Sequence, residues 1–126
     1  MLLTTLHEAL QLLQGNDDTK YGNVLRDSVI KRFEYSIDTF WKLIKEYIEV
    51  TQGVVVSGSP KMVAKTALDL KMITQEEYSF FLDMVDSRNL TSHTYNKVLA
   101  QEISNHIPGY YHMMKAIAGR LKDIYE

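Results

Sequence analysis

The chain has 126 residues, a formal net charge of −2 and no cysteine. This length predicts one domain, residues 1–126, and the lack of cysteine excludes disulfide scaffolds, thiolate catalysis and cysteine-based zinc sites. The slight negative charge argues against a protein that coats nucleic acid, although it leaves room for an enzyme that holds a few phosphates.

Two amphipathic helices are predicted in the first half of the chain. Leucine and alanine recur at helical spacing over residues 2–13, and Gly15 is expected to end this helix before a linker over residues 16–23. The second helix is predicted over residues 24–51, where an apolar stripe runs along one face and charged side chains occupy the others. The stripe consists of Leu25, Val29, Phe33, Ile37, Phe40, Trp41, Ile44 and Ile48.

Start and stop signals place two further helices. Gly53 is expected to end the long helix, and the valines at 54–56 predict at most a short extended piece. Ser59-Pro60 has the pattern of an N-cap followed by proline at the first helical position, so a helix is predicted from there to about Ile73. Residues 74–77, Thr-Gln-Glu-Glu, have the capping-box pattern that opens the next helix.

A last helix is predicted from about Lys97 to the end of the chain. Its apolar positions keep helical spacing, and Pro108-Gly109 is expected to kink or interrupt it. No segment alternates convincingly with the period of a strand. About five helices and little else predict an all-α antiparallel bundle with a four-helix up-and-down core.

The segment 88–95, Arg-Asn-Leu-Thr-Ser-His-Thr-Tyr, combines three kinds of chemistry. The Arg88 guanidinium can grip phosphate oxygens, the His93 imidazole can move protons near neutral pH, and the Tyr95 phenol can act as a nucleophile. Residues five apart on a continuous helix point about 140° from one another. The helix must therefore end or distort if Arg88 and His93 are to face one site.

The chain resembles the HEPN superfamily, in its branch of nucleotidyltransferase substrate-binding proteins. The likeness is carried by residues 25–34 and 41–43, by Ser59-Pro60, and by residues 83–95, which include the Arg88–Tyr95 segment. These stretches follow one another in the right order and extend over most of the chain. An arginine and a histidine at this spacing would be weak evidence alone, but their combination with the upstream helix and the trailing tyrosine is specific.

The resemblance implies a HEPN-like bundle that forms a homodimer and is paired with a minimal nucleotidyltransferase as toxin and antitoxin. Many members of the superfamily are metal-independent endoribonucleases. Arg88, Asn89 and His93 would then form the catalytic site on RNA, with His93 as general acid or base and Arg88 on the phosphate. The transferase would inhibit the toxin by attaching AMP to Tyr95.

Other interpretations of the same residues remain open. Arg88 could pair with Asp83 or Asp86 while His93 caps a helix and Tyr95 packs at its start, because structural ion pairs also produce such clusters. The protein could also be a non-catalytic subunit that presents a substrate to the transferase. A third possibility is a plain helical interaction module.

Two other groups of residues invite a functional interpretation. Arg26 and Arg32 lie in the family-like stretch and could contact phosphate, although such residues more often form surface ion pairs. Glu102 and His106 share a helical face, with His112 nearby, but a metal site would need a further ligand and a supporting shell. We therefore expect no metal and no cofactor.

The sequence also predicts where the protein works. Its first residues lack the basic segment and cleavage site of a secretory signal, and no apolar run approaches the length of a bilayer span. We therefore expect a cytoplasmic protein without membrane contact.

Overall fold

Five α-helices and one short 3-10 turn make up the structure, a computed structural model that describes residues 3–16, 21–56 and 58–125. The elements are α1 (Thr4–Asn16), α2 (Gly22–Gln52), α3 (Pro60–Asp69), α4 (Gln75–Leu90), the turn η1 (Thr91–His93) and α5 (Lys97–Tyr125). No strand occurs in these described ranges. The predicted all-α helical bundle is confirmed.

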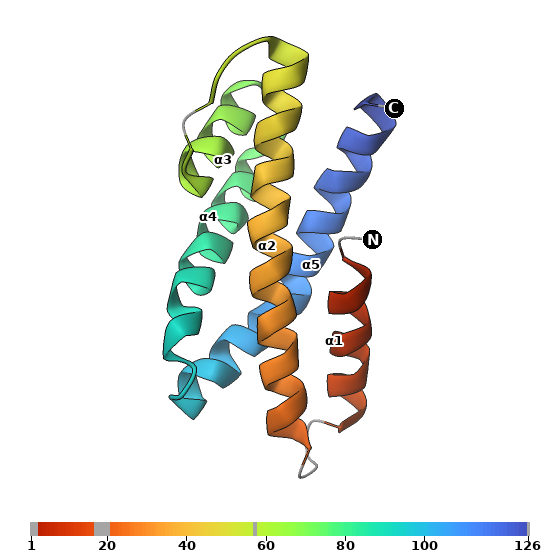
Figure 1. Ribbon diagram of the computed structural model, residues 1–126, viewed down its shortest axis with the longest axis vertical. Helices are drawn as coiled ribbons and strands as arrows, with labels where there is room; N and C mark the ends of the chain where they lie inside the picture. Colours follow the sequence, from red (N-terminus) through yellow and green to blue (C-terminus); the bar gives the residue numbers. More distant parts are fainter. Residues whose placement is uncertain (1–2, 17–20, 57, 126) are drawn as a thin grey trace.

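The long helix α2 is the centre of the bundle (Figure 1). The helix α1 runs antiparallel along its lower half, and α4 runs antiparallel to it on the other side. The helix α5 crosses behind α2 at an angle, while the short α3 packs on α2 and α4 near the upper end. This arrangement places the turn between α4 and α5 at one end of the bundle.

The core follows the apolar stripe of α2. Its fully buried side chains recur every three or four residues and include Val29, Phe33, Ile37, Phe40, Ile44 and Ile48. Side chains from every other α-helix, among them Leu6, Val63, Phe81, Met84, Ile107 and Met114, complete this core. Each fully buried large apolar side chain stabilises the fold by about 1.5–3 kcal/mol, so this stripe fixes how the helices pack.

The predicted helix signals of α2, α3 and α4 are present. Gly53 ends α2 in the left-handed conformation with φ of 65°, and its N–H donates to the Glu49 carbonyl. The Ser59 hydroxyl accepts from the backbone N–H of Met62 at 3.2 Å. At Thr74 both bonds of a capping box form, so the start of α4 is confirmed.

Some predicted boundaries differ from the structure. Gly15 lies inside α1, and α2 begins at Gly22 within the predicted linker. Positions 17–20 of that linker lie outside the described residues. The valines at 54–56 belong to no strand, and the Val56 N–H donates instead to Glu49 Oε2 at 3.0 Å.

Pro108 does not interrupt α5, contrary to one of the two predicted outcomes. The helix continues through it, with Ile107 and Tyr110 buried on either side at 0% and 3% exposure. A proline inside a helix costs about 3 kcal/mol, and burial of two large side chains offsets a cost of that size. Within the described residues, no helix is both long and apolar enough to cross a membrane.

Candidate functional site

The helix α4 ends inside the Arg88–Tyr95 segment, as the spacing of Arg88 and His93 requires. The last residue of α4 is Leu90, and the chain tightens into the 3-10 turn η1. The Asn96 side chain then caps α5 by accepting from the N–H groups of Val98 and Leu99 at 3.0 and 3.1 Å. The change of direction separates Arg88, on α4, from His93 on the following turn.

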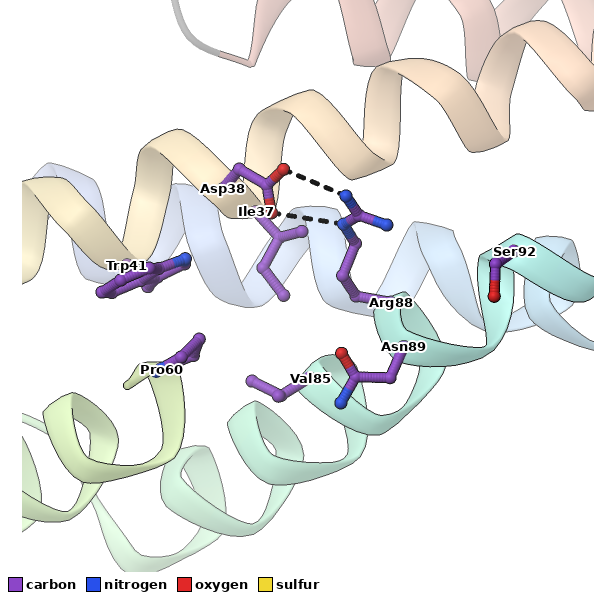
Figure 2. Close-up of a pocket in the computed structure, with 8 residues that line it drawn as sticks. All are labelled: Ile37, Asp38, Trp41, Pro60, Val85, Arg88, Asn89 and Ser92. Atoms are coloured by element: carbon purple, nitrogen blue, oxygen red, sulfur yellow. Dashed lines mark hydrogen bonds and ion pairs between the residues drawn. The ribbon is translucent and has the colours of Figure 1, made fainter. Parts of the chain in front are cut away.

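A cleft of about 280 Å³ opens beside Arg88, between α2, the start of α3 and the end of α4 (Figure 2). It is lined by Ile37, Asp38, Trp41, Pro60, Val85, Arg88, Asn89 and Ser92. The structure therefore brings Arg88 and Asn89 to one cleft. His93 and Tyr95 are not among the residues that line it.

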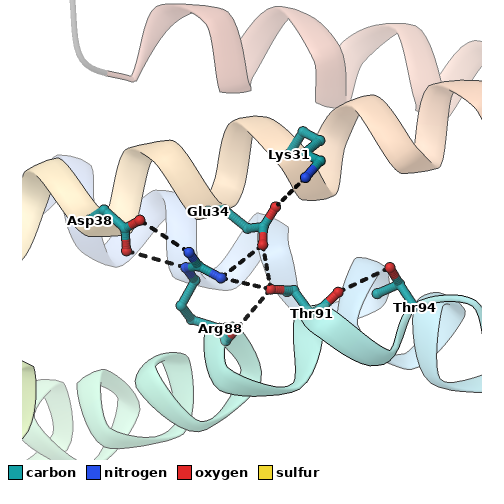
Figure 3. A network of polar contacts seen from close by, with 6 residues as sticks. All are labelled: Lys31, Glu34, Asp38, Arg88, Thr91 and Thr94. Carbon is teal, nitrogen blue, oxygen red and sulfur yellow. Dashed lines mark hydrogen bonds and ion pairs between the residues drawn. The ribbon is translucent and has the colours of Figure 1, made fainter.

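Arg88 is held by two acidic side chains of α2 (Figure 3). Its Nε and Nη2 donate to the two carboxylate oxygens of Asp38 at 3.2 and 3.1 Å, in the parallel fork that guanidinium groups form with carboxylates. Its Nη1 donates to Glu34 Oε2 at 2.8 Å. This network ties the end of α4 to the middle of α2.

Thr91 completes the network from the first residue of η1. Its hydroxyl oxygen accepts from Arg88 Nη1 at 2.9 Å and lies 2.7 Å from both Glu34 Oε2 and the Arg88 carbonyl oxygen. The side chain is buried, at 5% exposure. Lys31 approaches the other oxygen of Glu34 at 3.5 Å from the solvent side.

These contacts restrict what Arg88 can bind. All three nitrogens of the Arg88 guanidinium donate within this network, Nε and Nη2 to Asp38 and Nη1 to Glu34 and Thr91. The hydrogen bonds that Arg88 donates to Asp38, together with the charges of Asp38 and Glu34, raise the pKa of Arg88 above its ordinary value despite the opposing effect of burial. A phosphate could bind Nε and Nη2 of Arg88 together only by displacing the Asp38 carboxylate.

His93 and Tyr95 form a separate exposed pair. The Nδ1 atom of His93 lies 3.3 Å from the phenolic oxygen of Tyr95, and the two rings meet edge to face. Tyr95 is 83% exposed. A neutral imidazole nitrogen can accept a hydrogen bond from a phenol, so this geometry would let His93 act as a general base toward the Tyr95 hydroxyl.

The alternative in which the segment only supports the fold is wrong in its details. Arg88 pairs with Glu34 and Asp38 of α2, whereas Asp86 pairs with Lys61 at 2.7 Å. The cap of α5 is Asn96 rather than His93, and Tyr95 is exposed instead of packed. The ion pair itself is nevertheless structural, because it joins two helices.

The two arginines predicted as phosphate contacts point elsewhere. Arg32 Nη1 donates to the Thr5 carbonyl of α1 at 2.9 Å, and Arg26 Nη1 donates to Asn23 at 2.7 Å. At about 100° per residue, Arg32 lies roughly 160° around α2 from Glu34. The structure therefore does not bring Arg32 to the Arg88 network.

The histidines of α5 do not gather into a metal site. Glu102, His106 and His112 are exposed, and His112 meets the ring of Tyr111. Across the part of the chain that the structure describes, no three histidine or carboxylate side chains converge as metal ligands.

Sequence reasoning missed the residues of α2 and α3 that face the segment. Glu34 and Asp38 are four residues apart and so share one face of α2, but this spacing is common among solvated acidic residues. The sequence pattern of Trp41 indicates the core or a dimer interface, and that of Pro60 a helix start. Only the packing of α3 and α4 on α2 shows that they line the cleft.

Comparison with known proteins gives two findings. A model of the family described as nucleotidyltransferase substrate binding protein like matches residues 2–123. Among solved structures, the crystal structure of a protein from Thermus thermophilus is 37% identical, with a TM-score of 0.77, covering 92% of this chain and 98% of that chain. No curated protein matches the sequence.

Proposed function

The chain belongs to the nucleotidyltransferase substrate binding protein like family, and on that premise we propose that it is the partner of a minimal nucleotidyltransferase that attaches AMP to Tyr95. The observation that carries this proposal is the 83% exposure of Tyr95 beside an imidazole nitrogen at 3.3 Å. An acceptor must be reachable by a second active site, and this phenol is reachable. The Thr91 hydroxyl also lies beside a possible base, the Glu34 carboxylate, but Thr91 is buried at 5% exposure. Tyr95 is therefore the exposed residue of the Arg88–Tyr95 segment that combines a hydroxyl with a neighbouring base.

The transfer needs only a nucleophile and a proton acceptor from this chain. The Tyr95 phenolic oxygen attacks the α-phosphorus of ATP held by the transferase, and pyrophosphate leaves. The phenolic proton passes to His93 Nδ1, which accepts it as a general base. The product is an AMP phosphodiester on Tyr95, whose phenolic oxygen lies 3.3 Å from His93 Nδ1 before modification.

Intact-mass measurement after co-expression with the transferase tests this proposal. We expect a mass gain of one AMP unit, lost in Tyr95→Phe and slowed in His93→Ala. The matched control is Tyr35→Phe, which removes the hydroxyl of another well-exposed tyrosine, at 68% exposure on α2. An unchanged mass with an active transferase, or a gain that survives Tyr95→Phe, contradicts the proposal.

A second candidate function is metal-independent endoribonuclease activity in a homodimer, as in a toxin–antitoxin pair. The observation in its favour is that Asn89, in the last turn of α4, and His93, in the turn η1, are both exposed close to Arg88 in the chain. His93 would take the proton of the RNA 2′-hydroxyl while its copy in the second protomer protonates the leaving oxygen. Arg88 would exchange Asp38 for the scissile phosphate, and AMP on Tyr95 would then block His93.

Purified unmodified protein tests the ribonuclease candidate. RNA should be cleaved without added metal, and His93→Ala should abolish cleavage while His106→Ala, a change at an exposed histidine of α5, leaves it intact. Size-exclusion chromatography with light scattering checks the proposed homodimer. If no RNA is cleaved but the transferase still binds or modifies the chain, the protein is a non-catalytic binding subunit.

A further inference from the structure

The cleft beside Arg88 has two apolar walls. Figure 2 shows Trp41 of α2 and Pro60 of α3 opposite each other at one end, with Ile37 and Val85 between them and the polar end. Trp41 is only partly buried, so part of its ring is accessible. The cleft volume of about 280 Å³ lies just below the usual size of small-molecule pockets and is of the size that one ring system would fill.

The polar end of the cleft presents an amide without an internal partner. The Asn89 side chain makes no hydrogen bond or ion pair with residues 3–16, 21–56 and 58–125, and the residue is exposed. An asparagine amide offers one acceptor oxygen and two N–H donors. Adenine carries an adjacent acceptor and donor on its edge, which asparagine pairs with in a bidentate manner. Ser92 adds a hydroxyl at the same end.

The charge of the cleft disfavours phosphate as the primary ligand. The single positive charge of Arg88 is matched by Asp38 and Glu34, which hold it at 3.1 and 2.8 Å. Asp38 also lines the cleft and is 46% exposed, so an entering anion meets a carboxylate. A neutral base meets no such repulsion, and its exocyclic amino group can donate to a free lone pair of Asp38.

We infer that the cleft between α2, α3 and α4 binds an adenine-type base, stacked on Trp41 and held at its edge by Asn89. This inference deepens the proposed function, on which it rests for the identity of the nucleotide. It places the base in the cleft and leaves the phosphate outside, toward η1. Stacking on an aromatic ring and an edge-to-amide pair are the two interactions by which proteins hold unpaired bases.

Trp41 provides a built-in probe, because it is the only tryptophan of the chain. Adenosine is titrated into the unmodified protein while indole fluorescence is excited at the red edge of its band, where adenosine does not absorb. We expect saturable quenching by adenosine and none by ribose 5-phosphate. Arms with AMP and with a short oligoadenylate RNA, either of which supports the inference, distinguish a mononucleotide from RNA as the source of the base.

Asn89→Ala separates edge recognition from non-specific stacking. Loss of the amide is expected to weaken adenosine binding about tenfold, as removal of a hydrogen-bonding pair does. The control Asn105→Ala, at an exposed asparagine of α5 that accepts from Gln101, should bind as the wild type does. The inference is overturned if adenosine gives no saturable quenching, if ribose 5-phosphate quenches equally, or if Asn89→Ala binds unchanged. Modification of Tyr95 is measured by mass, so either result can fail without the other.

Discussion

Replacing Arg88 by alanine is expected to lower the free energy of unfolding by about 2 kcal/mol, because hydrogen bonds to charged partners contribute about 1.5–3 kcal/mol each and are partly screened here. Glu34 is 17% exposed and would keep a largely desolvated carboxylate without its partner at 2.8 Å. The Asp38 side chain is 46% exposed and can be hydrated by water once Arg88 is removed, so loss of its contact should lower stability much less. The larger part of the loss therefore comes from the contact with Glu34.

Double-mutant cycles measured by urea unfolding separate the two contacts. Coupling between Arg88 and Glu34 is expected at about 1–2 kcal/mol, and coupling between Arg88 and Asp38 below about 1 kcal/mol. The control is Lys61→Ala, which breaks an ion pair of 2.7 Å whose two side chains are both more than half exposed and should leave stability nearly unchanged.

Two results would refute this reasoning. One is an Arg88→Ala protein that unfolds at the wild-type urea concentration, and the other is a stronger coupling to Asp38 than to Glu34. The measurement also matters for function. If Arg88→Ala is less stable than the wild type, a loss of activity in this variant reports on folding as well as on chemistry. Arg88→Lys keeps the positive charge but lacks the planar fork, so it is the better functional variant once its stability is shown to equal that of the wild type.

Three further predictions concern the helices. Thr74→Ala removes the hydroxyl that caps α4 and should cost about 1 kcal/mol in urea unfolding; unchanged stability would contradict the capping box. The Arg120 guanidinium holds the pKa of Glu77 below its ordinary value of 4.5, so this stabilisation is complete above about pH 4.5 and is lost as pH falls through the lower, folded-state pKa. Glu77→Gln should accordingly show a smaller loss of unfolding free energy on acidification than the wild type, and an equal loss would count against it. Gly119→Ala, at an exposed position of α5 with open space around it, should raise the unfolding free energy by up to about 1 kcal/mol. Gly109→Ala should gain less, because its added Cβ would lie 2.9 Å from an aromatic ring, and an equal gain at both sites would overturn that comparison.

The sequence by itself determined where α3 and α4 begin and where α2 ends. Ser59-Pro60 and the Thr74–Glu77 box fix helix starts through bonds between residues three positions apart, so no distant contact is needed to predict them. The apolar stripe of α2 likewise predicts its buried face. The spacing of Arg88 and His93 also predicted that α4 ends or distorts between them, and the helix does end there, at Leu90, before the turn η1.

Tertiary structure alone decided the partners of Arg88 and the shape of the cleft. Asp38 and Glu34 lie 50 and 54 positions before Arg88, and Trp41 and Pro60 line one cleft only because α3 folds back onto α2. Side-chain contacts over such separations depend on the crossing angles and offsets of packed helices, which no local pattern encodes. The sequence shows that Arg88 and His93 are near each other in the chain. Only the packing of the helices shows that Arg88 pairs with acidic side chains of α2 while His93 is exposed to solvent.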